Sequence, residues 1–199
     1  MGKMKKILVT GADGQLGQCF QAVAQEFPEQ HLIFAQKAEV DITVPKSYNS
    51  MYQKRPFDGI INCAAYTLVD KAEDEPLLAH RINVDGIKNI IDFANGQTYK
   101  PKIIFTSTSE VYGGSQYHKL IKYPTDEKNI ITLPDLSLPR TSYMLSKLYG
   151  EAMCHASGLD CLILRPHNIY GPRMGMKHVI PQLIKKILNT PEQGVLDVY

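Results

Sequence analysis

Short apolar runs alternate with amphipathic helical patterns along the whole chain. The apolar runs predict β-strands at Lys6–Thr10, His31–Ala35, Gly59–Cys63, Lys102–Thr106 and Cys161–Leu164. Within each run the apolar residues are largely continuous rather than alternating with polar ones. Such runs are typical of strands in a parallel sheet, because helices bury both faces of that kind of sheet.

Between and after these runs, apolar residues recur at the spacing of an α-helix. The predicted helices are approximately Gln15–Phe27, Thr43–Lys54, Asp74–Asn95, Thr141–Ala156 and His178–Leu188. The regular order of strand and helix predicts an α/β fold with a doubly wound parallel sheet. A polar stretch from Gly113 to Pro139 predicts a long loop, and loops of that length are usually functional or mobile.

Composition narrows the class of protein. The chain has 199 residues, of which 44% are hydrophobic and 21% are charged, as is ordinary for a globular protein. Lys and Arg number 22, and Asp and Glu number 20. So small an excess of positive charge argues against a nucleic-acid partner. The basic start is followed by only a short apolar stretch, Ile7–Val9, whereas a signal peptide needs ~7–15 apolar residues and a membrane span ~20. We therefore expect a cytoplasmic protein without a membrane partner.

The sequence offers no pattern for a metal site or for a serine hydrolase. The four cysteines, Cys19, Cys63, Cys154 and Cys161, form no C-x-x-C pair and have no zinc-site spacing. This usage is typical of a reduced compartment. The G-x-S-x-G turn of serine hydrolases is also absent from the sequence.

Glycines follow the first predicted strand. Gly11, Gly14 and Gly17 lie in a turn that leads into the first predicted helix. Gly11 permits a tight turn, Gly14 lets a pyrophosphate approach the backbone, and Gly17 allows close packing of helix and strand. The free N–H groups at the start of the helix favour the same anion. The spacing alone also fits an ordinary strand–helix turn, but its position after the first strand favours a dinucleotide site.

The residue that recognises the ribose of the cofactor is expected about 20 residues after the glycine turn. An acid at that point favours NAD, and a basic residue tolerates the extra phosphate of NADP. Lys37 follows the second predicted strand, and no carboxylate stands at that point. The cofactor is therefore NAD or NADP, with a weak preference for NADP, although Lys37 also fits a solvated surface lysine. Asp41 and Ile42 are candidates for holding the adenine, with the Ile side chain against the ring.

Tyr143 and Lys147 are four residues apart in a predicted helix, so they share one face. A neighbouring ammonium favours the phenolate and lowers the pKa of the tyrosine, which predicts that Tyr143 acts as a general acid or base. The stretch Thr106–Gly113 after the fourth strand supplies hydroxyls, one of which could bind the same substrate oxygen, and Glu110, a second acid or base. Without Tyr143, this stretch would equally fit a Ser/Thr-rich turn with a solvated glutamate.

Together these segments resemble the extended short-chain dehydrogenase/reductase family, and within it the NAD-dependent epimerases and dehydratases. The resemblance covers almost the whole chain. The segments that carry it are Thr10–Gly17, Asn62–Tyr66, Ser107–Gly113, Tyr143-x-x-x-Lys147 and Arg165–Pro172. It implies a Rossmann fold, NAD or NADP as cofactor, and a nucleotide sugar as substrate.

The resemblance also implies roles for particular residues. Gly11, Gly14 and Gly17 would bind the pyrophosphate, and Ala64 and Ala65 would line the cofactor groove. Thr108, Tyr143 and Lys147 match the catalytic residues of the family. Pro166 and Asn168 would lie by the nicotinamide or the substrate phosphates.

The implied reaction begins with hydride transfer at a sugar carbon. Tyr143 would move the hydroxyl proton while Lys147 holds the ribose. The main expectation is an enzyme of the epimerase/dehydratase type, and Glu110 favours elimination or decarboxylation. However, the segment Asn62–Asn83 is similar to dTDP-4-dehydrorhamnose reductases, so a nucleotide-sugar reductase or decarboxylase is the alternative. A further alternative is a non-catalytic module that only binds a dinucleotide.

The resemblance predicts two parts, an NAD(P)-binding domain over residues 1–177 and the start of a substrate-binding lobe over residues 178–199. The smaller C-terminal lobe of the family is expected to be missing or truncated, and the chain to turn over its substrate slowly or not at all. Analogy with the family predicts a homodimer, formed through the helices that match residues 74–95 and 141–156. Cell-surface polysaccharide biosynthesis is the expected context.

Overall fold

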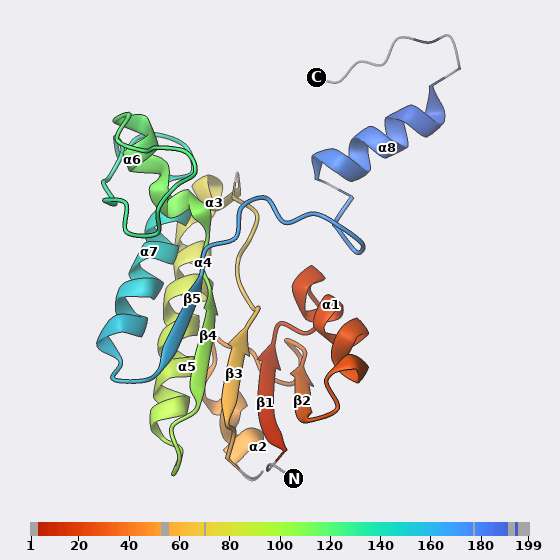
Figure 1. Cartoon of the computed structure of the whole chain (residues 1–199), viewed down its shortest axis with the longest axis vertical. Helices are drawn as coiled ribbons and strands as arrows, with labels where there is room; N and C mark the ends of the chain where they lie inside the picture. Colours follow the sequence, from red (N-terminus) through yellow and green to blue (C-terminus); the bar gives the residue numbers. More distant parts are fainter. Residues whose placement is uncertain (1–3, 53–55, 70, 177, 191–193, 195–199) are drawn as a thin grey trace. The chain divides into compact units, whose positions relative to one another are not determined.

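The predicted strands form a parallel sheet of five strands in the order β2-β1-β3-β4-β5 (Figure 1). The computed structural model describes residues 4–52, 56–69, 71–176, 178–190 and 194. The strands are β1 (Lys5–Thr10), β2 (Gln30–Ala35), β3 (Gly59–Asn62), β4 (Lys102–Thr106) and β5 (Cys161–Leu164). Since all neighbours are parallel, the loops that follow the strands lie at one edge of the sheet.

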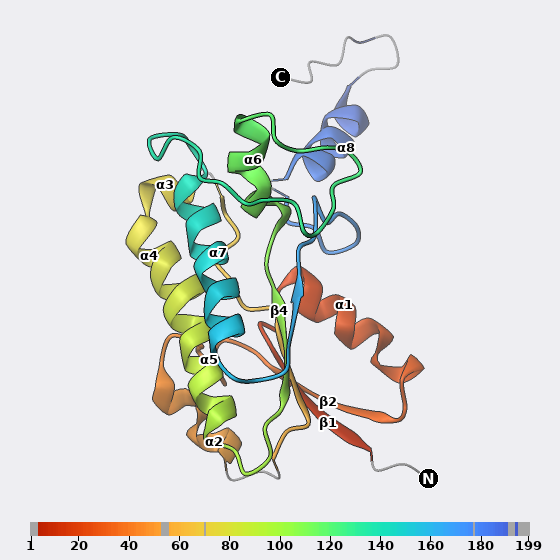
Figure 2. The ribbon, with the colours of Figure 1, turned by 60° about the vertical axis from the view of Figure 1, so that its left-hand side comes forward.

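Helices cover both faces of this sheet (Figure 2). One face carries α4 (Pro76–His80), α5 (Gly86–Asn95) and α7 (Thr141–Ala156), and the other carries α1 (Gln15–Val23). The prediction of a doubly wound parallel sheet is therefore confirmed. The shorter elements are η1 (Ala24–Glu26), η2 (Pro45–Tyr48), α2 (Asn49–Tyr52), α3 (Lys71–Asp74), η3 (Arg81–Asp85), η4 (Ser109–Tyr112) and α6 (Gly113–Tyr117).

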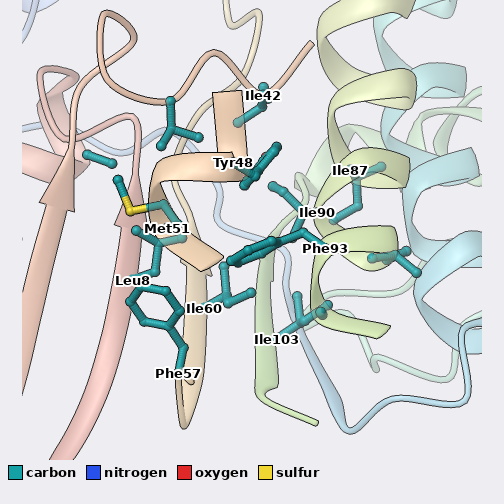
Figure 3. Close-up of a cluster of buried hydrophobic side chains, with 14 of the residues drawn as sticks. Leu8, Ile42, Tyr48, Met51, Phe57, Ile60, Ile87, Ile90, Phe93 and Ile103 are labelled. Carbon is teal, nitrogen blue, oxygen red and sulfur yellow. The ribbon is translucent and has the colours of Figure 1, made fainter. Parts of the chain in front are cut away.

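The main core lies between the sheet and the helix α5 that covers one of its faces (Figure 3). The ring of Tyr48 in η2 stacks on that of Phe93 in α5, with centroids 4.8 Å apart. Residues that share this core are Leu8, Ile42, Tyr48, Met51, Phe57, Ile60, Ile87, Ile90, Phe93 and Ile103. Each large apolar side chain buried in this way contributes about 1.5–3 kcal/mol, so the core holds η2 and α5 against the strands.

The segment Asp74–Asn95, predicted as one helix, is divided. Pro76 begins α4 in the first turn of that helix, where a missing N–H costs nothing. A π-helical turn, η3, then separates α4 from α5. Within it, the Asn83 side chain bonds the backbone of Tyr66 and the hydroxyl of Ser146, so tertiary contacts set the irregular turn.

The stretch Gly113–Pro139, predicted as a loop, begins with the short helix α6. Glycines start this helix, so its local sequence gives little helical signal. The Ser115 hydroxyl donates to the carbonyl of Ile130 and accepts from the N–H of Thr132 at 3.3 Å. Contacts with the following loop therefore stabilise a helix that the sequence pattern does not show.

The structure divides into two units, Met1–His167 and Asn168–Tyr199. The boundary falls a little before the predicted one after residue 177. The second unit contains α8 (Val179–Asn189), close to the predicted helix. Apolar side chains of α8 and of the preceding loop line a groove of about 650 Å³: Met174, Met176, Ile180, Ile184 and Leu188. That this unit starts a substrate-binding lobe stays a prediction.

Two kinds of feature are absent from the described ranges. Among the described residues, no helix combines the length and the apolar character that crossing a membrane requires. Within the same part of the chain, no three His, Cys, Asp or Glu side chains gather as metal ligands would.

Candidate active site

The predicted site residues of the first unit gather at the carboxyl edge of the sheet. The glycine turn follows β1, Ala64 and Ala65 follow β3, and the turn from Ser107 to Tyr112 follows β4. Parallel strands place these segments side by side, and ligands of doubly wound folds bind at this edge. Two features result, a groove at the glycine turn and a cluster of polar side chains around Tyr143.

The first feature, which we call the glycine-turn groove, encloses about 230 Å³. Most of the predicted cofactor-binding residues line it: Gly11, Gly14, Lys37, Asp41, Ile42, Ala64 and Ala65. Other lining residues escaped prediction from the sequence: Asp13, Val40, Thr43, Cys63 and Ile82. The segments 11–14, 37–43 and 63–65 thus meet as the glycine pattern predicts.

Steric limits fix the shape of the turn. Gly11 has φ +67°, and a Cβ there would lie 2.6 Å from the backbone nitrogen of Ala64, so only glycine fits. Gly17 is buried, and a Cβ there would lie 2.4 Å from the carbonyl oxygen of Gly11. Gly17 therefore brings α1 close to the turn and does not itself line the groove. No side chain caps α1, which leaves N–H groups at its start for an anion.

Two charged residues of the groove, Lys37 and Asp41, come from the segment that follows β2. Burial raises the pKa of Asp41, but hydrogen bonds from Thr43 and the charges of Lys37 and Arg81 outweigh this, and the net pKa is lowered. The Thr43 N–H and hydroxyl donate to the Asp41 carboxylate at 2.9 and 2.8 Å. Lys37 is exposed at the groove. Ile42 lines the groove, and its side chain, 4% exposed, also packs beside Gly86.

The second feature consists of Thr108, Glu110, Tyr143 and Lys147, and we call it the Tyr143 cluster. Tyr143 and Lys147 lie on one face of α7, only 6% and 3% exposed. Thr108 precedes η4, where its side chain accepts a hydrogen bond from the Glu110 N–H at 3.2 Å, and it also hydrogen-bonds Tyr143. The structure thus brings together the hydroxyls that the sequence predicted to share a substrate oxygen.

The pKa of Tyr143 moves in the direction opposite to the one expected. Burial and the charge of Glu110 raise it, the Thr108 bond and the charge of Arg140 lower it, and the net pKa is above 10.0. The expected lowering by Lys147 is wrong, because the Lys147 ammonium turns elsewhere. Its Nζ donates to the carbonyl of Thr106 at 3.0 Å and lies 5.4 Å from the centre of the Phe105 ring.

Lys147 and Cys63 connect the two features. Burial lowers the pKa of Lys147 to about 8, partly opposed by Cys63. Burial raises the pKa of Cys63 to about 12, and the charge of Lys147 opposes this. Cys63 lines the glycine-turn groove, and β3 and β4, which lead to Cys63 and Thr106, are neighbours in the sheet, so Lys147 at Thr106 lies near the groove.

Glu110 is engaged in an ion pair. Its carboxylate lies 3.0 Å from the guanidinium of Arg140, and the two side chains are 27% and 49% exposed. Arg140 immediately precedes α7 and has φ +72°, a conformation that is strained for a residue with a side chain. Glu110 is therefore positioned near Tyr143 as a paired carboxylate.

Pro166 and Asn168 are placed differently. The carbonyl of Pro166 accepts the N–H of Ser109 at 3.0 Å, so Pro166 lies beside the turn that holds Thr108. Asn168 belongs to the second unit, where it has φ +44°. A role of either residue at the nicotinamide stays a prediction.

The sequence analysis missed a buried polar network next to the Tyr143 cluster. Glu151 is 3% exposed and bonds both Ser107 and Arg165. Glu151 follows Lys147 by the same four residues that separate Lys147 from Tyr143. That repeat of polar residues on one helix face is the signal that would have found it.

Comparisons with known proteins agree with this geometry. The family described as the RmlD substrate binding domain matches residues 4–193. A dTDP-4-dehydrorhamnose reductase of Sinorhizobium fredii is 29% identical over 174 residues, covering 87% of this chain and 53% of the relative. A GDP-6-deoxy-D-mannose reductase of Pseudomonas aeruginosa is 26% identical over 206 residues, covering 98% and 64%.

A solved structure extends the comparison. The dTDP-4-dehydrorhamnose reductase of Bacillus anthracis in complex with NADP is 26% identical, with a TM-score of 0.74, covering 93% of this chain and 60% of that one. The chain therefore spans roughly half to two thirds of the length of these relatives.

Proposed function

The chain belongs to the RmlD substrate binding domain family, and from this premise we propose that it reduces the keto group of a nucleotide sugar with NADPH. The family has the expected fold of extended short-chain dehydrogenases/reductases. One observation carries the proposal: the Tyr143 cluster adjoins the glycine-turn groove, because Cys63 of the groove follows β3 beside the end of β4, where the Thr106 carbonyl accepts the bond from Lys147. Reduction of a carbonyl needs a hydride at carbon and a proton at oxygen, and this edge offers a place for each donor.

The protonation state of Tyr143 supports the reductive direction. A phenol whose pKa is raised stays protonated at neutral pH, as a proton donor must be. Oxidation of a sugar hydroxyl, the first step of epimerisation or dehydration, would instead require Tyr143 as a base. The relatives named as reductases act on sugars carried by two different nucleotides, so they too favour the reductase alternative over the epimerase/dehydratase expectation.

The residues of the groove fit NADP. Gly11 packs directly against the Ala64 backbone, which holds the turn in place, and Gly14, which has no side chain, lines the groove where a pyrophosphate would approach the backbone. Lys37 lines the end where the ribose is expected, while the Glu39 carboxylate accepts the N–H of Gln36 at 3.0 Å. Gly11, Gly14 and the start of α1 would hold the pyrophosphate, and Lys37 the 2′-phosphate. Bound there, NADPH supplies the hydride.

The chain's own residues would supply the proton and the orientation. Tyr143 donates its hydroxyl proton to the carbonyl oxygen of the keto sugar, and Thr108 hydrogen-bonds the same oxygen. Lys147, with a pKa of about 8, stays largely protonated at neutral pH and, held at the Thr106 carbonyl, would bind the ribose of the cofactor. The surrounding burial excludes water and strengthens each of these interactions.

Glu110 separates the candidate reactions. Elimination or decarboxylation would use it as a further acid or base, but its carboxylate pairs with Arg140 at 3.0 Å. Reduction needs no such group. The non-catalytic dinucleotide-binding module would need neither Glu110 nor the Thr108–Tyr143 pair.

The other expected properties remain part of the proposal. A nucleotide sugar is the proposed substrate, within cell-surface polysaccharide biosynthesis. A homodimer and a cytoplasmic location stay predictions.

The test incubates the protein with NADPH and, in separate reactions, dTDP-4-dehydrorhamnose and a GDP-4-dehydro-6-deoxy sugar. Consumption of NADPH, with a product heavier by H₂ in the mass spectrum, supports the proposal. An isomer, or a product lighter by water, formed without net consumption of NADPH, would favour the epimerase/dehydratase alternative. Binding of NADPH without turnover of any nucleotide sugar would contradict the proposed reductase activity of this chain.

A further inference from the structure

We propose that Glu151 is a positioning residue, which ties the turn carrying Thr108 to helix α7 and so keeps Thr108 within hydrogen-bonding distance of Tyr143. The inference rests on the proposed function, because it concerns the same proton donor. It assigns a role to a buried network outside the Tyr143 cluster.

The argument begins on the buried face of α7. Tyr143, Lys147 and Glu151 follow each other at four-residue spacing, and all are at most 6% exposed. A carboxylate buried to that extent is costly unless hydrogen bonds and an opposite charge compensate it. The partners that compensate Glu151 therefore show what it holds in place.

Those partners come from the ends of two strands. The guanidinium of Arg165, which follows β5, donates from Nε to Oε1 at 2.9 Å and from Nη2 to Oε2 at 2.6 Å. The hydroxyl of Ser107, which follows β4, donates to Oε1 at 2.5 Å. Both carboxylate oxygens are thus engaged, and the two-point bond to Arg165 fixes the direction of the carboxylate as well as its distance.

The same arginine also reaches the other end of the turn. Its Nη1 donates to the Tyr112 hydroxyl at 2.6 Å and to the carbonyl of Glu127 at 3.3 Å. The guanidinium also lies 5.0 Å from the centre of the Tyr112 ring. Ser107 and Tyr112 are the two ends of the turn that contains Thr108, so the Glu151–Arg165 pair holds the turn at both ends.

Backbone hydrogen bonds cannot perform this task. The N–H of Ser107 donates to Leu164 and that of Ser109 to Pro166, at 2.7 and 3.0 Å. These bonds join the turn to the end of β5 and leave α7 out. Among the described contacts of Ser107, the bond to Glu151 is the one that reaches the helix bearing Tyr143. Because a misplacement of about 1 Å costs up to roughly 100-fold in rate, this tie matters for catalysis.

The test compares two ion pairs at opposite ends of β4 and β5, Glu151–Arg165 and Lys102–Asp160. Glu151→Gln keeps the shape of the side chain but removes the charge, and Ser107→Ala removes one hydroxyl while leaving the Glu151–Arg165 pair intact. The matched control is Asp160→Asn, which breaks the exposed pair between Lys102 and Asp160, 3.1 Å apart. Each variant is assayed for kcat, for KM of the keto sugar and for the Kd of NADPH.

We expect Glu151→Gln to lower kcat by about 10- to 100-fold, with KM and the Kd of NADPH changed less than about threefold. Ser107→Ala should lower kcat in the same direction by less, and Asp160→Asn should leave all three constants unchanged. Equal losses in Glu151→Gln and Asp160→Asn, or a loss that falls on KM or Kd instead of kcat, would overturn the assignment. If Glu151→Gln does not fold, Ser107→Ala decides.

A second readout does not depend on turnover. The ¹³Cζ resonance of Tyr143, assigned by its loss in Tyr143→Phe, responds to hydrogen bonding at the phenol oxygen. It should shift in Glu151→Gln and Ser107→Ala but not in Asp160→Asn. An unmoved resonance in both site variants would refute the positioning role even if the protein reduces no sugar, so the two proposals fail separately.

Discussion

The glycine-turn groove and the Tyr143 cluster lie at the same edge of the sheet but are stabilised in different ways. The groove is built around the glycine turn, whose shape depends on the absence of a Cβ at Gly11 beside Ala64. Polar side chains form the cluster and its surroundings, and each finds its partner on another element, as Lys147 does at Thr106 and Glu151 at Arg165. Steric changes in the groove should therefore impair binding, whereas changes in the cluster should impair chemistry.

The largest expected effect separates chemistry from binding. Tyr143→Phe removes the proton donor but keeps the buried ring, so we expect the rate of reduction to fall by ~10²–10⁴-fold with NADPH binding nearly intact. Steady-state kinetics and fluorescence titration of NADPH measure the two quantities.

The matched control lies on the same helix. Tyr149 is 57% exposed, so Tyr149→Phe should leave both the rate and the binding unchanged. Near-normal reduction by Tyr143→Phe would show that another group donates the proton.

An intermediate effect should fall on binding. Gly11→Ala places a Cβ 2.6 Å from the backbone of Ala64 at φ +67°, and left-handed backbone alone costs an alanine about 1–2 kcal/mol. We expect the Kd of NADPH to rise more than about tenfold, while kcat at saturating NADPH changes much less.

Gly158 provides the control for backbone strain. It has φ +71°, and a Cβ there would meet no other atom within 4 Å, so Gly158→Ala carries the strain without the clash. Gly158→Ala should lower the midpoint of urea unfolding but leave the Kd of NADPH unchanged. Equal Kd values in the two variants would contradict the steric account of the groove.

The smallest effect concerns the choice of cofactor. Lys37→Asp replaces an exposed cation at the groove with an acid, which repels a 2′-phosphate and accepts a ribose 2′-hydroxyl. We expect the preference for NADPH over NADH, measured as the ratio of their Kd values, to fall by about three- to tenfold, the scale of an exposed charge interaction. Lys46→Asp, an exposed lysine outside the groove, should not change the ratio; an unchanged ratio in Lys37→Asp would place Lys37 outside the ribose site.

The sequence predicts those parts of the fold that local patterns determine. The limits of β4, β5 and α7 agree with the predicted ones to the residue, because continuous apolar runs and a regular helical face mark them. It does not predict α6 or the break at η3. Bonds from Ser115 and Asn83 to residues distant in the sequence produce both.

The same division holds for the candidate site. The position of the glycine turn is predicted correctly, since spacing after a strand defines a turn, whereas its binding of a pyrophosphate stays a prediction. The direction in which the pKa of Tyr143 shifts is not predicted correctly. Four-residue spacing places Lys147 on the right face of the helix without showing that its ammonium points to Thr106. Glu151 was missed although it continues the four-residue spacing on α7, because its partners, Ser107 and Arg165, follow β4 and β5 and are distant in the sequence.

The most direct test of the central claim follows the hydride. The protein is incubated with NADPH deuterated at the transferable position of the nicotinamide and with dTDP-4-dehydrorhamnose, and the sugar product is analysed by mass spectrometry. The account predicts that each NADPH consumed leaves one deuterium on the reduced carbon of the sugar. A sugar product without deuterium, formed while the labelled NADPH remains unconsumed, would contradict it.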